Sequence, residues 1–238
     1  ITECYSSKLP SDRQGEVFHR YILGVYDLYE RLTNEFPEVL FESCASGGGR
    51  FDPGMLYYAP QGWTSDDSDA IERLKIQYGT SMCYPLSSMG SHVSVVPNHQ
   101  VFRNTPLHTR ANVAYFGTFG YELDLNKLTE EEIKEVKEQI TFMKEYRELI
   151  QFGTFYRLKS PFEGNETVWM TVSEDKKTAL VFWYRERNVV NADFTRVRLQ
   201  GLDPDLIYRN EYNETENYGD ELMNLGLLTT DCTAGEPT

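Results

Sequence analysis

The residues best suited to acid–base chemistry are three aspartates within the segment SDDSD at residues 65–69. Carboxylates this close repel one another, which raises the pKa of whichever is least solvated. A raised pKa is what a general acid needs in order to work near neutral pH. Capping of a following helix by Ser65, Ser68 or Asp69 is the simpler interpretation, and one aspartate can cap while another does chemistry. The glycine and distal glutamate of an EF-hand are absent, which disfavours a calcium site.

A second candidate is the glycine-rich loop at residues 44–52, in which Gly47, Gly48 and Gly49 are consecutive. Glycine permits positive φ and lets the backbone approach a ligand closely. A tight strand-to-helix turn that touches no ligand explains the glycines equally well. The loop lacks the Lys-Ser/Thr ending of a phosphate-binding loop, and its spacing does not fit a dinucleotide fingerprint.

Metal, cofactor and serine-hydrolase chemistry find no support in the sequence. The four histidines are His19, His92, His99 and His108, and the four cysteines are Cys4, Cys44, Cys83 and Cys232. None of them is paired at metal-ligand spacing, and no G-x-S-x-G elbow is present. His92 follows a predicted strand, where it lines a pocket or is buried with a hydrogen bond. Thiols so far apart favour a reduced, cytoplasmic protein without metal or cofactor.

Strands and helices that alternate over residues 1–153 must position these loops. The expected helices begin at capping boxes at residues 11–14 and at Thr129, with a third helix over 71–78 capped by Gly79. Short apolar runs predict strands at residues 39–41, 62–63, 82–86 and 114–121. This alternation predicts β/α units with parallel strands, and in a β/α barrel active sites lie at the C-terminal ends of the strands.

The pattern changes after Gly153. Short apolar or alternating runs predict strands at residues 155–158, 168–172, 179–184 and 195–199. Turn residues separate them, which predicts an antiparallel sheet. We therefore expect two domains, 1–153 and 154–238, with no clean closing strand in the tail from Tyr218 onward.

Composition excludes several classes of partner. Lys and Arg number 23 against 37 Asp and Glu in 238 residues, a formal net charge of −14. That charge repels nucleic acid phosphates and anionic membrane surfaces, and no apolar run approaches the length of a membrane span. Aromatic residues make up 13% of the chain, which suits a packed core and also sugar-binding sites.

Three segments together resemble the bacterial α-galactosidases of glycoside hydrolase family 36. They are residues 41–58 (FESCASGGGRFDPGMLYY), residues 63–74 (WTSDDSDAIERL), and residues 84–100, which include YPLSSMGSHVS and VPNHQ. The resemblance extends from Ile1 nearly to the end of the chain. It implies an α/β fold: the second half of a (β/α)8 TIM barrel, followed by an antiparallel β-sandwich-type C-terminal domain.

The resemblance also assigns site residues. The family's acid/base is the first aspartate of its Trp-x-Ser-Asp-Asp segment, which corresponds to Asp66. Its galactose-binding cysteine and the glycine three residues later correspond to Cys44 and Gly47. The nucleophile belongs to a Lys-Trp-Asp segment, and no such segment occurs in this sequence. The resemblance implies retaining hydrolysis of terminal α-linked galactose in oligosaccharides such as melibiose and raffinose.

The same resemblance implies that the chain is an internal piece of a longer enzyme and is inactive alone, because retaining hydrolysis needs two carboxylates. Family members are often tetrameric, so an oligomeric parent enzyme is expected, and the widely spaced cysteines favour a cytoplasmic location. Two alternatives stay open. One is a galactosyl transferase of the same family, and the other is a non-catalytic sugar-binding protein.

Overall fold

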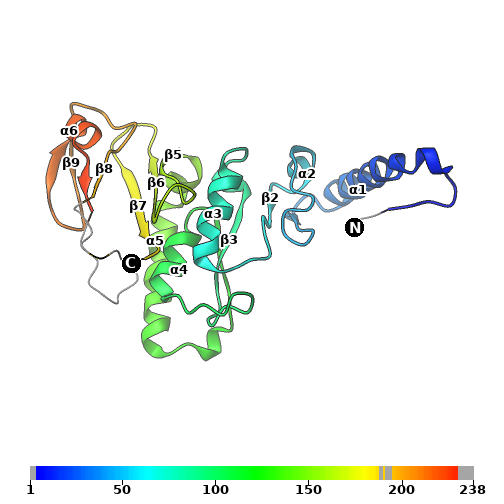
Figure 1. The fold of residues 1–238 in the computed structure, drawn as a ribbon, viewed down its shortest axis with the longest axis horizontal. Helices are drawn as coiled ribbons and strands as arrows, with labels where there is room; N and C mark the ends of the chain where they lie inside the picture. Colours follow the sequence, from blue (N-terminus) through cyan, green and yellow to red (C-terminus); the bar gives the residue numbers. More distant parts are fainter. Residues whose placement is uncertain (1–3, 188–189, 191–194, 230–238) are drawn as a thin grey trace. The chain divides into compact units, whose positions relative to one another are not determined.

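In the computed structural model, the described residues are 4–187, 190 and 195–229. The chain divides into two compact units, Ile1–Trp63 and Thr64–Thr238, which are described in turn (Figure 1).

The first unit contains two helices and one pair of parallel strands. Its elements are η1 (Ser11–Arg13), α1 (Gly15–Glu35), β1 (Glu42–Ser43), α2 (Pro53–Tyr58) and β2 (Gln61–Gly62). Register pairs Glu42 with Gln61 and Ser43 with Gly62. The parallel pairing confirms the predicted β/α character of this segment.

Side-chain contacts tie α1 to α2. Asp52 caps α2 by accepting from Met55 N at 2.9 Å, and the Tyr26 hydroxyl of α1 donates to the same carboxylate oxygen at 2.9 Å. This hydrogen bond raises the pKa of Tyr26. Gly54 keeps the contact close, because a Cβ there would lie 2.3 Å from the Tyr26 hydroxyl oxygen.

Two predictions for this unit were wrong. No capping box precedes α1, since residues 11–13 form a 3-10 turn and the Gln14 side chain binds the backbone of Ser6 and Leu9 instead. The run at residues 39–41 is not a buried strand: Val39 is 52% and Leu40 72% exposed, and the strand begins at Glu42. An apolar run alone did not locate it.

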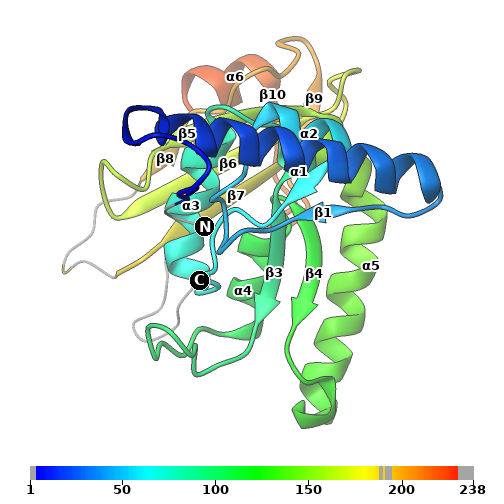
Figure 2. The ribbon, with the colours of Figure 1, turned by 90° about the vertical axis from the view of Figure 1, so that its right-hand side faces the viewer.

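The second unit opens with alternating helices and strands. They are α3 (Ala70–Ser81), η2 (Leu86–Ser88), β3 (Gly90–Ser94), α4 (Leu107–Ala114), β4 (Thr118–Glu122), η3 (Leu125–Lys127) and α5 (Glu130–Phe152). β3 and β4 pair in parallel and lie side by side, as Figure 2 shows. The capping box at Thr129 and the helix end at Gly153 are confirmed.

The predicted strand at residues 82–86 was wrong. α3 runs through Gly79 to Ser81, so Gly79 is not its cap, and Cys83 N and Tyr84 N still bind Thr80 O in helix-like turns. Pro85 then precedes η2, and the strand begins only at Gly90. The run at residues 114–121 is likewise divided between the end of α4 and β4.

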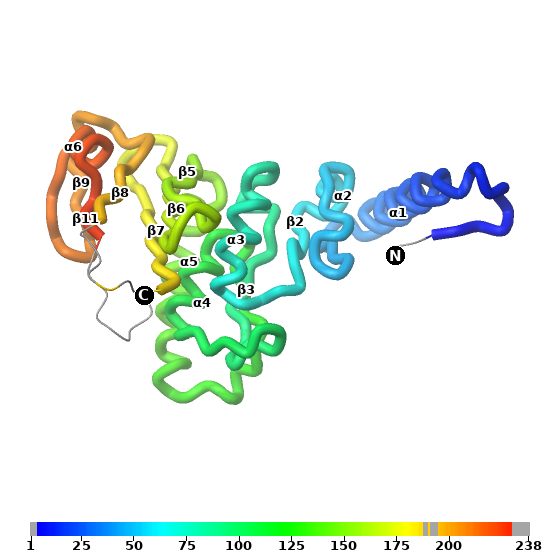
Figure 3. Tube along the Cα trace, viewed as in Figure 1, coloured from blue at the N-terminus to red at the C-terminus, as the bar shows by residue number. Residues whose placement is uncertain are grey.

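The remaining elements are mainly antiparallel strands. They are β5 (Thr154–Lys159), β6 (Glu166–Val172), β7 (Ala179–Arg185), β8 (Arg196–Val197), β9 (Ile207–Arg209), β10 (Glu216–Tyr218), α6 (Gly219–Asn224) and β11 (Leu227–Leu228). β6 is the centre of the sheet β5–β6–β7, which confirms the expected antiparallel arrangement. The tail does contain a short strand, because β11 pairs with β8 (Figure 3).

Both faces of β6 are buried. One face carries Val168, Met170 and Val172 into a cluster with residues of β8 and α6. The other face carries Trp169, whose ring packs edge-on against Phe116 at 5.2 Å between centroids. This second face joins the antiparallel sheet to the helices before it.

Candidate active site

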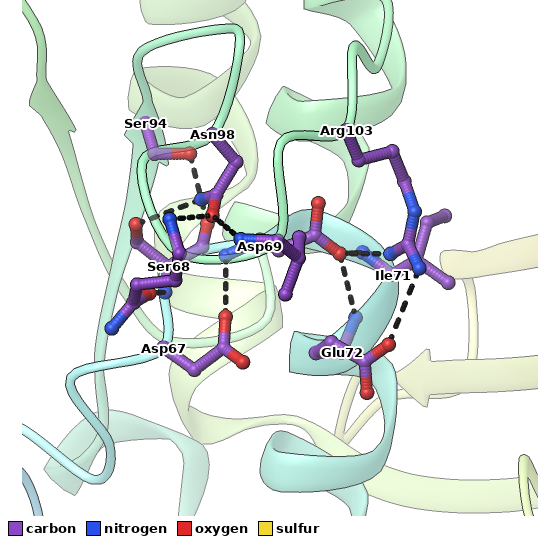
Figure 4. Close-up of polar contacts among 10 residues, drawn as sticks. Asp67, Ser68, Asp69, Ile71, Glu72, Ser94, Asn98 and Arg103 are labelled. Atoms are coloured by element: carbon purple, nitrogen blue, oxygen red, sulfur yellow. Dashed lines mark hydrogen bonds and ion pairs between the residues drawn. The ribbon is translucent and has the colours of Figure 1, made fainter.

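The segment at residues 64–69 connects β2 to α3 and begins the second unit. Asp69 caps α3, since its Oδ2 accepts from Ile71 N and Glu72 N at 3.1 Å each. The Arg103 guanidinium binds the same oxygen, although Asp69 is only 2% exposed. Arg103 also donates to Glu72 at 3.3 Å. Figure 4 shows these contacts.

Asp67 completes the turn before Asp69. Its Oδ1 accepts from Asp69 N at 3.0 Å, and its own N–H donates to Ser65 Oγ at 3.1 Å. Short side chains that bind nearby backbone groups in this way shape turns. The capping interpretation is therefore confirmed for Asp69, and Asp67 has a structural role as well.

Asp66 differs from its two neighbours. It is exposed, and the hydrogen bond described for it goes to its backbone carbonyl, from Gln100 Nε2 at 2.8 Å. Among the described residues, no donor binds its carboxylate. Asp69, the least exposed of the three, accepts hydrogen bonds from two backbone N–H groups and from Arg103. Asp66 is therefore the carboxylate of this segment that is open to a ligand.

A buried polar network beneath the segment fixes Ser68. Asn98 Nδ2 donates to Ser68 Oγ at 3.2 Å, and Ser94 Oγ donates to Ser68 O at 2.8 Å. All three residues are buried. Asn98 and Gln100 belong to the connection between β3 and α4, and so does Arg103. Two consecutive loops of the β/α pattern are therefore fastened to each other.

Arg73 of α3 binds the start of the segment at residues 64–69. Its guanidinium donates to Thr64 Oγ1 at 3.3 Å, Ser65 O at 3.2 Å and Gly90 O at 2.7 Å. Burial lowers the pKa of Arg73 to about 10, so it remains cationic at neutral pH. Arg73 thus links α3, the segment and the first residue of β3.

The glycine-rich loop lies in the first unit. Cys44 is exposed, and its carbonyl accepts from the Arg50 guanidinium at 3.0 Å. Gly47 is buried with φ of 69°, a left-handed conformation that favours glycine, and its carbonyl accepts from Ala45 N at 3.1 Å. A Cβ on Gly49 would lie 2.5 Å from Ala45 O. The glycines therefore form a tight turn that leaves the Cys44 thiol exposed.

The predicted site residues thus occupy both units. Cys44 and Gly47 share one turn of the first unit, while Asp66 belongs to the second. The meeting of these three residues around one sugar stays a prediction.

His92 lies within β3 rather than after a strand. Its side chain is 30% exposed, and its Nδ1 lies 3.9 Å from the Glu122 carboxylate of β4. It is neither fully buried nor part of a metal cluster. Within the described residues, no three His, Cys, Asp or Glu side chains gather as metal ligands.

Cys4, Cys44 and Cys83 form no disulfide with one another, and Cys232 lies outside the described residues. No helix in the described part of the chain has the length and apolar character required to cross a bilayer.

Two family models match this chain. The family model described as Melibiase matches residues 1–153, and the model of the glycosyl hydrolase family 36 C-terminal domain matches residues 166–235. The chain is 57% identical to alpha-galactosidase AgaA of Geobacillus stearothermophilus over 95% of its own length and 31% of that protein. It is 51% identical to alpha-galactosidase Mel36A of Lactobacillus acidophilus, with the same coverage.

Solved structures agree. The crystal structure of the Geobacillus stearothermophilus enzyme AgaA superposes with a TM-score of 0.93 at 55% identity, covering 98% of this chain and 32% of that one. Variants of AgaA have been solved in complex with raffinose and with stachyose. The chain spans about a third of the length of the relatives it matches.

The fold class is therefore α/β, the second half of a (β/α)8 barrel followed by an antiparallel β domain. The first family model spans more than half of the chain, and the second covers the antiparallel part. The chain belongs to the melibiase family, and its C-terminal part is that of glycosyl hydrolase family 36.

Proposed function

We propose that this chain forms part of a retaining α-galactosidase and supplies its acid/base carboxylate, Asp66. The substrates are oligosaccharides with a terminal α-linked galactose, such as melibiose and raffinose. One observation carries the proposal. In a segment where Asp67 and Asp69 are engaged by backbone or arginine donors, Asp66 alone presents a carboxylate without a donor among the described residues.

Retaining hydrolysis needs a second carboxylate roughly 5–5.5 Å from the first. In the first step that carboxylate attacks the anomeric carbon while Asp66 gives its proton to the departing glycosidic oxygen. In the second step Asp66 takes a proton from water, whose oxygen displaces the enzyme carboxylate. This sequence contains no Lys-Trp-Asp segment to provide the nucleophile. We assign the nucleophile to a part of the enzyme other than this chain.

The glycine-rich turn supplies the sugar contacts in this proposal. The exposed Cys44 thiol and the backbone at Gly47 bind galactose near its 2-hydroxyl. Support comes from the family membership and from the tight turn, which allows a sugar ring to approach the backbone closely.

We further propose that the enzyme is cytoplasmic and oligomeric. Exposed Cys44 and Cys83 suit a reducing compartment. Cell fractionation tests the compartment, and light scattering of the intact enzyme tests the oligomeric state.

The decisive experiment replaces Asp66 by Ala in the intact enzyme that contains this chain. Values of kcat/KM for melibiose and for 4-nitrophenyl α-galactoside report bond cleavage up to the first irreversible step. Melibiose has a poor leaving group that needs protonation, so its kcat/KM should fall by about 10²-fold or more, whereas the aryl galactoside should lose far less. Added azide should restore turnover of the aryl substrate, because it attacks the galactosyl-enzyme without a general base.

Asp67→Asn is the matched control, since it keeps an oxygen to accept from Asp69 N. It should leave the ratio between the two substrates unchanged. Equal losses for both substrates in Asp66→Ala would remove Asp66 from the acid role. Product analysis in the presence of a second sugar separates hydrolysis from galactosyl transfer, and the isolated chain should show no activity.

A further inference from the structure

We propose that Gln100 is a positioning residue for Asp66 and that it governs how fast the enzyme cleaves substrates whose leaving group must be protonated. The inference rests on the proposed function, because it takes Asp66 as the acid/base. Gln100 acts through Asp66 and needs no contact with the substrate.

Two hydrogen bonds hold the peptide group that joins Asp66 to Asp67. Its carbonyl oxygen accepts from Gln100 Nε2 at 2.8 Å, and its N–H donates to Ser65 Oγ at 3.1 Å. A peptide group is planar, so two hydrogen bonds on opposite edges fix its orientation. That plane constrains ψ of Asp66 and thereby the direction in which its Cα–Cβ bond leaves the backbone.

The other end of the Gln100 amide also binds this segment. Its Oε1 accepts from Ser68 N at 3.1 Å. One side-chain amide therefore bridges the backbone on both sides of Asp67, from Asp66 to Ser68. A residue with only a donor or only an acceptor could not hold both positions.

Asn98 holds the backbone of Gln100 in place. Asn98 Oδ1 accepts from Gln100 N at 2.9 Å and from Val101 N at 3.0 Å. Asn98 is 1% exposed and also donates to Ser68 Oγ, so the bridge starts from a buried, hydrogen-bonded base. Gln100 is itself exposed, which means that its side chain can be replaced without opening a cavity in the core.

Asp66 needs such a bridge to keep its carboxylate in place for proton transfer. The Asp66 carboxylate has no donor among the described residues, so its position depends on its backbone. Proton transfer requires the carboxyl within hydrogen-bond reach of the glycosidic oxygen. A misplacement of about 1 Å in a catalytic group can cost about 10²-fold in rate. Substrates with good leaving groups need no proton and should tolerate the same misplacement.

The test is a double-mutant cycle in the intact enzyme with Asp66→Ala and Gln100→Ala. Gln100→Ala alone should lower kcat/KM for melibiose by about tenfold and for 4-nitrophenyl α-galactoside by about twofold or less. In the Asp66→Ala background, Gln100→Ala should change kcat/KM for melibiose by less than about twofold, because the group that it positions is gone. Circular dichroism and the thermal midpoint verify that each variant is folded.

Two further variants sharpen the result. Gln100→Glu keeps the acceptor for Ser68 N and the length of the side chain but has no donor for Asp66 O, so it should show the same dependence on leaving group as Gln100→Ala. Val101→Ala is the matched control. Its exposed side chain has no polar atom, and the substitution keeps the N–H that binds Asn98. It should leave the substrate ratio unchanged.

The single Asp66→Ala variant decides the proposed function separately. If it shows dependence on the leaving group while Gln100→Ala slows both substrates equally, the assignment of Gln100 is overturned and that of Asp66 stands. The assignment of Gln100 would also be overturned if the effects of Asp66→Ala and Gln100→Ala on kcat/KM for melibiose were fully additive. If Asp66→Ala lowers kcat/KM equally for both substrates, the acid role of Asp66 is rejected, and so is the positioning role of Gln100.

Discussion

The segment at residues 64–69 and the turn at residues 44–50 each follow a short strand of the parallel pair β1–β2, but different forces shape them. Side chains distant in sequence hold the first, including Arg73, Asn98, Gln100 and Arg103. Backbone conformation shapes the second, with φ of 51° at Ser46 and 69° at Gly47. In the proposed function the first loop places a proton donor, which needs a fixed orientation, whereas the second receives a sugar, which needs room and backbone groups.

This comparison predicts that the first loop depends on polar side chains. Asp69→Ala removes the cap of α3 and the partner of Arg103 together, so it should destabilise the intact enzyme by about 3 kcal/mol. The thermal midpoint and the free energy of unfolding measure the effect. Asp69→Asn keeps a capping oxygen and loses only the charge, so it should cost less. If Asp69→Ala left the free energy of unfolding unchanged, side-chain contacts would not be what holds this loop.

The second loop should instead be sensitive to added carbon atoms. Gly49→Ala places a Cβ 2.5 Å from Ala45 O, a backbone atom that cannot move without opening the turn. We expect a destabilisation of about 2 kcal/mol, seen as a lower thermal midpoint, together with weaker galactose inhibition. Gly24→Ala is the control, since a Cβ at that helical glycine meets nothing within 4 Å. Equal midpoints for the two variants would contradict the distinction between the loops.

The smallest effect should come from Cys44→Leu. Cys44 is exposed and participates in the turn through its backbone carbonyl, so the fold should be unchanged. Loss of a sugar contact should weaken inhibition by free galactose by about fivefold, or about 1 kcal/mol. Unchanged inhibition in a folded variant would show that this turn has only a structural role.

The sequence predicted the local parts of this architecture. Capping of α3 within residues 65–69, the capping box at Thr129 and the antiparallel strands follow from spacings of a few residues, although the spacing did not single out Asp69 from Ser65 and Ser68 as the cap. The apolar runs at residues 39–41 and 82–86 were wrongly predicted as strands. Apolar composition does not distinguish a strand from a helix-like turn, which is what residues 82–86 form. Even the capping-box pattern at residues 11–14 failed, since Gln14 binds preceding carbonyls instead.

The network around Asp66 could not be predicted in the same way. Gln100 and Asp66 are 34 residues apart, and nothing in the spacing of VPNHQ indicates which loop its amide will reach. The resemblance marked this segment as characteristic without giving it a role. Roles that depend on hydrogen bonds between distant loops become visible only when the chain is folded.

The contact between the antiparallel sheet and the helices before it has a consequence for unfolding. Trp169 of β6 packs on Phe116, and the Tyr184 hydroxyl of β7 donates to Asn112 O of α4 at 2.7 Å. Arg157 of β5 reaches Ser81 O at 3.1 Å. Cutting the chain near Gly153 would expose Trp169, now 1% exposed, and leave these polar groups without partners. Thr64–Thr238 should therefore melt cooperatively, so that loss of the sheet also breaks the hydrogen bonds that hold the segment at residues 64–69.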